Sequence, residues 1–205
     1  MSSRYDQLIS MMDELPLSKS LPKILRMSQE LRDYELEKWV RLELHGYWDT
    51  NAALTEDVVV PEYRTVAGYY TDDYGRKLVI SDPDLGFVSQ IRLLSGVVEL
   101  EGMTGSAGPL AFRVPGFAEL IRKHLKVEVT TFNFSPKTIP PVLEAIRSRL
   151  SDHIVARKKR LLETASEPTI PESEDILVLR PNIYGIGFDL KALLRKFHKR
   201  SSKGK

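Results

Sequence analysis

The chain has 205 residues, of which 42% are apolar and 28% charged, and its formal net charge is +2. This composition fits one domain with a buried core and, at most, a short appendage. No apolar run approaches the ~18 residues that a membrane-spanning helix needs. The first residues lack the apolar stretch of a secretory signal, and the absence of cysteine excludes disulfides, thiolate metal sites and cysteine nucleophiles. We therefore expect a cytoplasmic protein without a transmembrane segment.

The first quarter of the chain predicts three short helices, because apolar residues recur at helical spacing over residues 5–14, 20–33 and 35–47. Pro22 fits near the first turn of the second helix, where a missing N–H costs little. Gly46 fits the end of the third helix, since glycine adopts the left-handed conformation without penalty. The short connections predict that these helices pack as antiparallel neighbours.

The pattern then changes to the β-branched and aromatic residues that favour strands. Strands are predicted over residues 58–60, 63–70 and 77–80, with an edge or a bulge at Pro61 and a turn over residues 72–75. Apolar residues near every fourth position predict a helix over residues 87–101. The glycines of residues 102–108 indicate a flexible loop.

The second half predicts a strand over residues 110–114, a helix over 115–125 and a half-buried strand over 126–134. Pro136 and Pro140 predict a preliminary turn before a long closing helix that reaches about residue 162. The order of elements predicts an α+β fold with an antiparallel sheet. We divide the chain into an α+β domain (1–163), an acidic linker (164–175), and a C-terminal apolar strand followed by a basic amphipathic helix (176–205).

Several short motifs occur in a characteristic order: Trp39, then Glu43-Leu44 and Gly46-Tyr47, then Pro61 to Arg64, and the closing helix. In this order and spacing, residues 5–163 resemble the AbiTii domain family, which is named for an abortive-infection, anti-phage system. The resemblance implies a defence context and supplies no catalytic residue. It marks these positions as structural or ligand-binding: Trp39, Glu43, Gly46, Tyr47, Glu62, Tyr63 and Arg64.

Trp39, Glu43 and Tyr47 lie four residues apart, on one face of the predicted third helix. A carboxylate between two aromatic rings has two interpretations. It is a ligand-binding or acid–base group, because apolar surroundings raise the pKa of a carboxyl, or it is a structural group that bonds a backbone N–H or pairs with Arg64. The second interpretation places the two charged groups within ~6 Å of each other.

No recognised catalytic motif is present. The four histidines are scattered, and the chain contains neither a P-loop nor a nucleophile elbow. Gly185 and Gly187 lack the third glycine of a dinucleotide-binding loop. We therefore predict no catalytic residue, no cofactor and no metal, while a toxin enzyme with an unrecognised site at residues 43 and 62–64 stays an alternative.

The C-terminal segment is the strongest functional candidate in the sequence, because residues 189–205 hold seven Lys and Arg against one acid. Its predicted helix has an apolar face and a cationic face, so it can pack on the domain, bind a partner, follow phosphates or lie on an anionic membrane. Arg157 to Arg160 form a second basic cluster. The predicted docking residues are Ile183, Tyr184, Gly185, Gly187, Phe188, Leu193 and Phe197. The predicted phosphate-binding residues are Lys191, Arg195, Lys196, Lys199 and Arg200.

The resemblance to the AbiTii family implies a phage-defence system, and with the absence of a catalytic motif and the apolar segment after the linker we expect a non-enzymatic interaction module. It docks onto itself as a homo-oligomer or onto a co-encoded effector, through its sheet and its C-terminal segment. A nucleic-acid-binding protein that uses the basic arm is the alternative from a different class. It requires binding that weakens steeply with salt.

Overall fold

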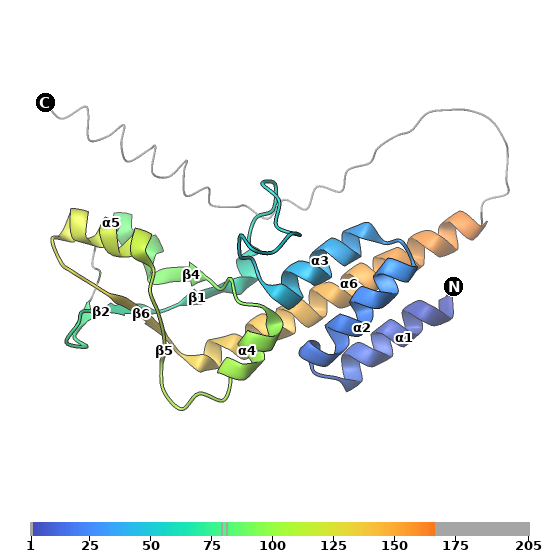
Figure 1. Cartoon of the computed structure of the whole chain (residues 1–205), viewed down its shortest axis with the longest axis horizontal. Coiled ribbons are helices and arrows are strands. Elements are labelled where there is room, and N and C mark those ends of the chain that lie inside the picture. Colours follow the sequence, from blue (N-terminus) through green and yellow to red (C-terminus); the bar gives the residue numbers. More distant parts are fainter. Residues whose placement is uncertain (1, 79, 81, 167–205) are drawn as a thin grey trace, which may run out of the picture.

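A computed structural model describes residues 2–78, 80 and 82–166 of the chain. One half is a helical bundle in which three N-terminal helices pack along the closing helix (Figure 1). The three predicted N-terminal helices are confirmed. The bundle consists of α1 (Ser2–Glu14), α2 (Leu17–Glu30), α3 (Tyr34–His45) and α6 (Ile139–Ser166).

The other half contains two small antiparallel sheets, so the predicted α+β class is confirmed. The two-stranded sheet pairs β1 (Thr65–Ala67) with β4 (Gln90–Arg92). The four-stranded sheet has the order β3 (Lys77–Leu78), β2 (Tyr69–Thr71), β6 (Thr131–Phe134) and β5 (Leu110–Phe112). The remaining elements are the helices α4 (Val97–Met103) and α5 (Pro115–Leu125) and the 3-10 turns η1 (Glu62–Arg64), η2 (Pro83–Ser89) and η3 (Pro136–Thr138).

Gly68 divides one extended stretch of chain between the two sheets. Its N–H donates to the carbonyl of Ser89 at 2.9 Å, beyond the end of β1, and β2 then pairs with β6. A Cβ at this position would lie 2.3 Å from the carbonyl oxygen of Asn133. The absence of a side chain therefore lets two backbones approach where the strand changes its partner.

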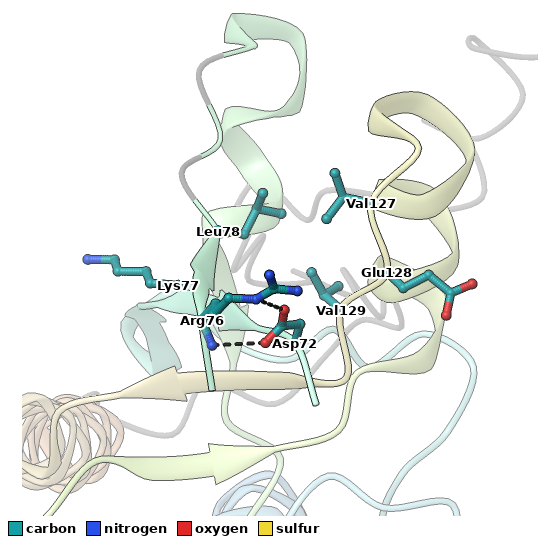
Figure 2. A pocket seen from close by; sticks show the side chains of 7 residues that line it. All are labelled: Asp72, Arg76, Lys77, Leu78, Val127, Glu128 and Val129. Carbon is teal, nitrogen blue, oxygen red and sulfur yellow. Dashed lines mark hydrogen bonds and ion pairs between the residues drawn. The ribbon is translucent and has the colours of Figure 1, made fainter. Parts of the chain in front are cut away.

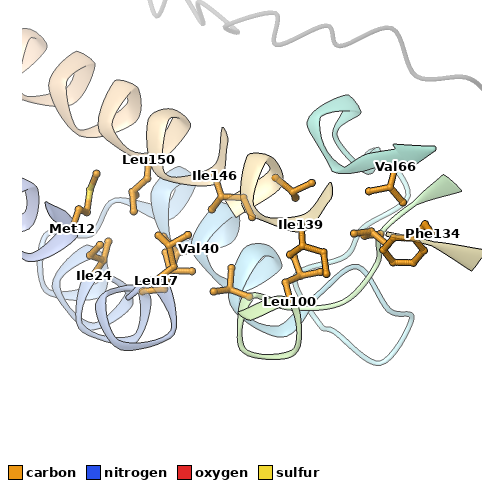
Figure 3. Close-up of a cluster of buried hydrophobic side chains, with 14 of the residues drawn as sticks. Met12, Leu17, Ile24, Val40, Val66, Leu100, Phe134, Ile139, Ile146 and Leu150 are labelled. Carbon is orange, nitrogen blue, oxygen red and sulfur yellow. The ribbon is translucent and has the colours of Figure 1, made fainter. Parts of the chain in front are cut away.

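A single core joins the two halves, and α6 runs through it (Figure 3). Ile146, Leu150 and Ile154 are fully buried, as the stripe of the closing helix predicted, and Leu143 is half-buried. Near the start of α6, the core continues towards the sheets through Phe134. Burial of this stripe is the main stabilising contribution of α6, since apolar area removed from water contributes roughly 25 cal/mol per Å².

The structure differs from the predicted elements in four places. The predicted strand over residues 63–70 begins only at Thr65, after the 3-10 turn η1, and Gly68 divides it between β1 and β2. Residues 58–60 form a loop: the N–H of Val58 donates to the carbonyl of Thr55 (2.9 Å), and none of the described strands pairs with the segment, although Nη1 of Arg92 in β4 donates to the Val60 carbonyl (2.9 Å). The predicted helix over 87–101 is wrong: residues 90–92 pair with β1, and a helix begins only after Gly96. The predicted strand over 126–134 is shortened to β6, since Lys126 takes the left-handed conformation (φ 58°) that ends α5.

The start of one predicted helix and the end of another also differ in the structure. Helix α2 begins at Leu17, after Pro16, so Pro22 lies inside the helix and not in its first turn. Helix α6 continues to Ser166, beyond the predicted end near residue 162, and the predicted preliminary turn is η3. The predicted C-terminal strand and basic helix, within residues 176–205, lie outside the described residues.

Candidate functional site

Four residues of the motifs quoted above meet between the helical bundle and the sheets. Glu43 lies in the last turn of α3, Tyr47 follows the Gly46 that ends this helix two residues earlier than predicted, and Tyr63 and Arg64 come from η1. Glu43 and Arg64 have no exposed side-chain surface, although their charges would favour water. Such burial requires that each charged group finds its partners inside the protein. We call these four residues the carboxylate cluster.

The carboxylate of Glu43 is hydrogen-bonded at both oxygens. Oε2 accepts from Nη2 of Arg64 at 2.5 Å and from its Nε at 3.2 Å. Oε1 accepts from the hydroxyl of Tyr47 at 2.7 Å and from that of Tyr63 at 2.6 Å. The predicted pairing of Glu43 with Arg64 is therefore present, with two tyrosines that the sequence argument did not assign to it as donors.

Arg64 joins the cluster to a third segment, residues 93–95. Its Nη1 donates to the carbonyls of Leu93 (3.0 Å) and Ser95 (2.8 Å), and its Cζ lies 4.8 Å from the centre of the Tyr47 ring. The backbone repeats the connection, since the N–H of Leu93 donates to the carbonyl of Arg64 at 2.9 Å. All three guanidinium nitrogens are thus engaged, which offsets the cost of burying the charge.

Two glycines allow the backbones around the cluster to come this close. Gly46 ends α3 with φ +85°, and a Cβ there would lie 2.4 Å from the carbonyl oxygen of Leu94. A Cβ on Gly96 would lie 2.3 Å from the carbonyl oxygen of Leu44. The side-chain amide of Asn51 donates to the Gly46 carbonyl at 2.7 Å and fixes the exit of the chain. The predicted role of Gly46 at the helix end is confirmed.

Burial raises the pKa of both tyrosine hydroxyls, and the neighbouring Glu43 carboxylate raises them further. Tyr47 and Tyr63 therefore remain neutral hydrogen-bond donors at physiological pH. The Glu43 carboxylate accepts four hydrogen bonds from Arg64 and the two tyrosines, so it has no free lone pair directed at a substrate. This geometry favours the structural interpretation of Glu43 over the acid–base interpretation.

The other two motif residues lie apart from these contacts. Trp39, one turn earlier on α3, makes its ring contact with His153 of α6, with centroids 5.4 Å apart. Burial lowers the pKa of His153, so its ring is held neutral against the tryptophan. Glu62 is exposed at the surface. The alternative site at residues 43 and 62–64 is therefore only partly assembled, with Glu43, Tyr63 and Arg64 in contact.

A second buried acid, Asp33, was missed by the sequence argument. It caps α3 through a hydrogen bond from the N–H of Leu36 (3.3 Å) and pairs with Nε of Arg157 at 2.8 Å. Lys158 pairs with Asp6 at 2.5 Å. Two cations of the predicted second basic cluster thus contact acids of the bundle, which leaves fewer charges for phosphates. Asp33 before a helix, three residues ahead of Leu36, was the available signal.

An open groove lies between the β2–β3 hairpin and residues 127–129 (Figure 2). Two of its four charged lining residues bond each other within the turn: Asp72 accepts from the N–H groups of Tyr74 and Arg76, each at 2.9 Å, and from Nε of Arg76 at 2.7 Å. In the part of the chain that the structure describes, no group of three or more His, Asp or Glu could hold a metal ion. No described helix is long and apolar enough to cross a membrane.

The predicted docking and phosphate-binding residues, from Ile183 to Arg200, lie outside the described residues. In comparisons with known proteins, a family model described as AbiTii matches residues 7–175. No curated protein and no solved structure matches the chain. The matched range includes nearly the whole helical bundle, both sheets and the carboxylate cluster between them.

Proposed function

The chain belongs to the AbiTii family, and we propose that it serves abortive-infection defence as a docking and oligomerisation module without catalytic activity of its own. The family supports the defence role. The docking surfaces are the sheet and the C-terminal segment. The partner is a second copy of the chain or an effector protein of the same defence system.

One observation carries the proposal: the polar groups of the carboxylate cluster, which is built from residues of the family motif, are hydrogen-bonded within the protein. Glu43 and Arg64 have no exposed surface, and their polar atoms bond one another, two tyrosines and the 93–95 segment. A catalytic carboxylate must reach a reacting group within about 3 Å or through one water. The cluster instead connects α3 to the sheets, so we infer that it is a structural joint.

The two alternatives have less support. A toxin enzyme built on Glu43, Glu62 and Tyr63 would have to open the joint and bring in Glu62, which points to solvent. A nucleic-acid-binding protein would have to use the C-terminal basic arm, because Arg157 and Lys158 of the second basic cluster pair with acids. Binding that is absent at ~50 mM salt would exclude this class, since phosphate contacts are strongest there.

A phage-protection assay separates the proposal from the enzyme alternative. In full-length chains, Tyr63→Phe and Glu62→Gln remove candidate reactive groups with little structural change, and both are expected to protect cells as the wild type does. Leu193→Asp with Phe197→Asp places charge on the predicted apolar face of the final helix and is expected to abolish protection. Ser201→Asp with Ser202→Asp adds the same charge outside that face and serves as the control.

Loss of protection by Tyr63→Phe or Glu62→Gln, with circular dichroism showing an intact fold, would contradict the proposal and favour an enzyme. Full protection by the Leu193→Asp and Phe197→Asp chain would also contradict it. In that case the apolar face of the final helix would have no part in the defence activity.

A further inference from the structure

The four-stranded sheet ends in one strand that is open to addition. Strand β5 occupies one edge and pairs with β6 alone among the described residues, in the register Leu110↔Phe134, Ala111↔Asn133. Ala111 is exposed, and Phe112 is half-buried although its ring lies 5.4 Å from the buried Phe134. An edge strand of this kind presents unpaired N–H and C=O groups and uncovered apolar side chains.

The other edge of the same sheet is different. Strand β3 has two residues, and one of them is Lys77, whose ammonium lies 4.5 Å from the centre of the Tyr69 ring. Short length and an inserted lysine are two means by which proteins block the addition of a foreign strand. Strand β5 has three residues, one more than β3, and contains no charge and no proline between Leu110 and Phe112. Addition of a strand is therefore favoured at β5.

The chain supplies a segment that fits this edge. Residues 176–179, Ile-Leu-Val-Leu, are an uninterrupted apolar run that the sequence predicts to be a strand. They follow Glu174 and Asp175, and an exposed Arg113 follows β5. Antiparallel addition brings the start of the incoming strand beside the end of β5, which places both acids near Arg113. The charges therefore select the antiparallel direction.

The length of α6 decides which copy provides the segment. Helix α6 has 28 residues and runs away from the sheets (Figure 1), so Ser166 lies about 40 Å beyond its start at a rise of ~1.5 Å per residue. The ten peptide steps from Ser166 to Ile176 span at most ~36 Å when fully extended. The apolar run therefore falls short of β5 in its own copy.

We propose that residues 176–179 of one copy add to β5 of a second copy as a fifth, antiparallel strand, and that the exchange is reciprocal. Main-chain hydrogen bonds provide the attachment, and alternate side chains of the run cover Leu110 and Phe112. This proposal rests on the proposed function and specifies its self-docking form. The assembly is a dimer joined by two equivalent contacts.

Cysteine cross-linking tests the exchange directly, because the natural chain contains no cysteine. A full-length Ala111→Cys chain is mixed with a full-length Leu177→Cys or Val178→Cys chain, and the mixtures are oxidised. We expect a mixed disulfide dimer with one of the two tail variants and not with the other, since neighbouring strand residues point to opposite faces. A dimer of Ala111→Cys chains alone would show that β5 pairs with β5 and would overturn the proposal.

Light scattering of purified full-length chains gives the second readout. We expect a dimer for the wild type, a monomer for Val178→Pro, and a dimer for the control Ser173→Pro, which places proline in the acidic linker. Val178→Pro interrupts only the run of residues 176–179, and Ala111→Pro interrupts only β5. A mixture of the two chains is therefore expected to form a heterodimer, in which the intact run of the Ala111→Pro chain adds to the intact β5 of the Val178→Pro chain. A wild-type monomer, or a Val178→Pro dimer, would overturn the exchange.

The two proposals fail in distinguishable ways. If the wild type is a monomer and Val178→Pro still protects cells from phage, strand exchange is wrong while docking onto another protein through the final helix stands. If the wild type exchanges strands and Tyr63→Phe abolishes protection in a folded chain, the dimer stands and the non-enzymatic function is wrong.

Discussion

Replacing Glu43 by glutamine is the change that most directly probes the carboxylate cluster. The side chain keeps its shape, but the Arg64 charge stays buried with only neutral acceptors around it. One amide oxygen cannot accept from Arg64, Tyr47 and Tyr63 in the positions that two carboxylate oxygens now occupy, and the new NH₂ group faces donors. We expect Glu43→Gln to lower the free energy of unfolding by about 3–5 kcal/mol.

This loss is a large part of the ~5–15 kcal/mol that a domain of this kind possesses. Urea unfolding followed by circular dichroism and by tryptophan fluorescence measures it as a lower midpoint at an unchanged slope. Glu62→Gln is the control, since Glu62 is exposed beside the cluster, and we expect a change within ~0.5 kcal/mol. A Glu43→Gln chain whose stability lies within ~1 kcal/mol of the wild type would refute the account of the cluster.

The double change Glu43→Leu with Arg64→Met distinguishes a buried pair from two independent groups. It removes both charges together and leaves two tyrosine hydroxyls and two backbone carbonyls without partners. Each unpartnered group costs about 1–3 kcal/mol if it stays dry. We expect the loss in the double variant to be clearly smaller than the sum of the two single losses, because no uncompensated charge remains. Additive losses would contradict a direct pairing.

Three further predictions follow from the same structure. Gly46→Ala forces a side chain into the left-handed region and against the Leu94 carbonyl, so its urea midpoint should fall by the equivalent of at least ~1–2 kcal/mol. The control is Gly102→Ala, in helix α4 with open space around it, which should raise the free energy of unfolding by ~0.5–1 kcal/mol. Burial raises the folded-state pKa of Tyr47 and Tyr63 above the ordinary value of 10. Both tyrosines are protonated in the folded and unfolded states below pH ~10, and above that pH only the unfolded state loses protons, so the free energy of unfolding should fall by up to ~1.4 kcal/mol per pH unit for each tyrosine. Urea titrations at pH 9–11 should show a smaller fall for Tyr47→Phe than for the wild type. Burial lowers the folded-state pKa of His153. As pH falls through ~6.5, the unfolded state binds the proton first, so the free energy of unfolding should decrease below that pH. A His153→Gln chain with the same pH dependence as the wild type would exclude His153 as the cause.

Much of the fold could be predicted because local patterns agreed with the tertiary structure. The apolar stripes of α1, α3 and α6 continue for several turns, and Gly46 and Pro115 mark helix ends in positions where backbone geometry allows little else. The order of helices and strands then indicated the α+β class. Long periodic elements are predictable because burial of one face decides their conformation.

Residues 87–101 could not be predicted because non-local contacts override their helical spacing. Gln90 to Arg92 form β4 only because β1, more than twenty residues earlier, lies beside them. Gly96 is extended and caps α4, and the carbonyl of Leu44 leaves no space for a side chain there. Neither contact has a signal in the segment itself, so periodicity alone favours the wrong element.

The candidate site was predictable as a pair and not as a network. Glu43 and Arg64 are charged residues in helix-adjacent apolar surroundings, which indicates a buried pair. The two tyrosine donors and the carbonyls of Leu93 and Ser95 depend on three segments that meet only in the fold. These hydrogen bonds favour a structural role for Glu43 over an acid–base role, and this distinction requires atomic positions.

The central claim, that the carboxylate cluster is a joint and not a reactive centre, is tested most directly by phage protection with the Glu43→Gln chain at ~20 and 37 °C. Stability of most domains is greatest near ~10–20 °C, so a structural defect is relieved by cooling while a missing catalytic group is not. We predict that protection is lost at 37 °C and returns at ~20 °C together with the folded circular dichroism spectrum. A chain that is folded at ~20 °C and still fails to protect cells would contradict the claim.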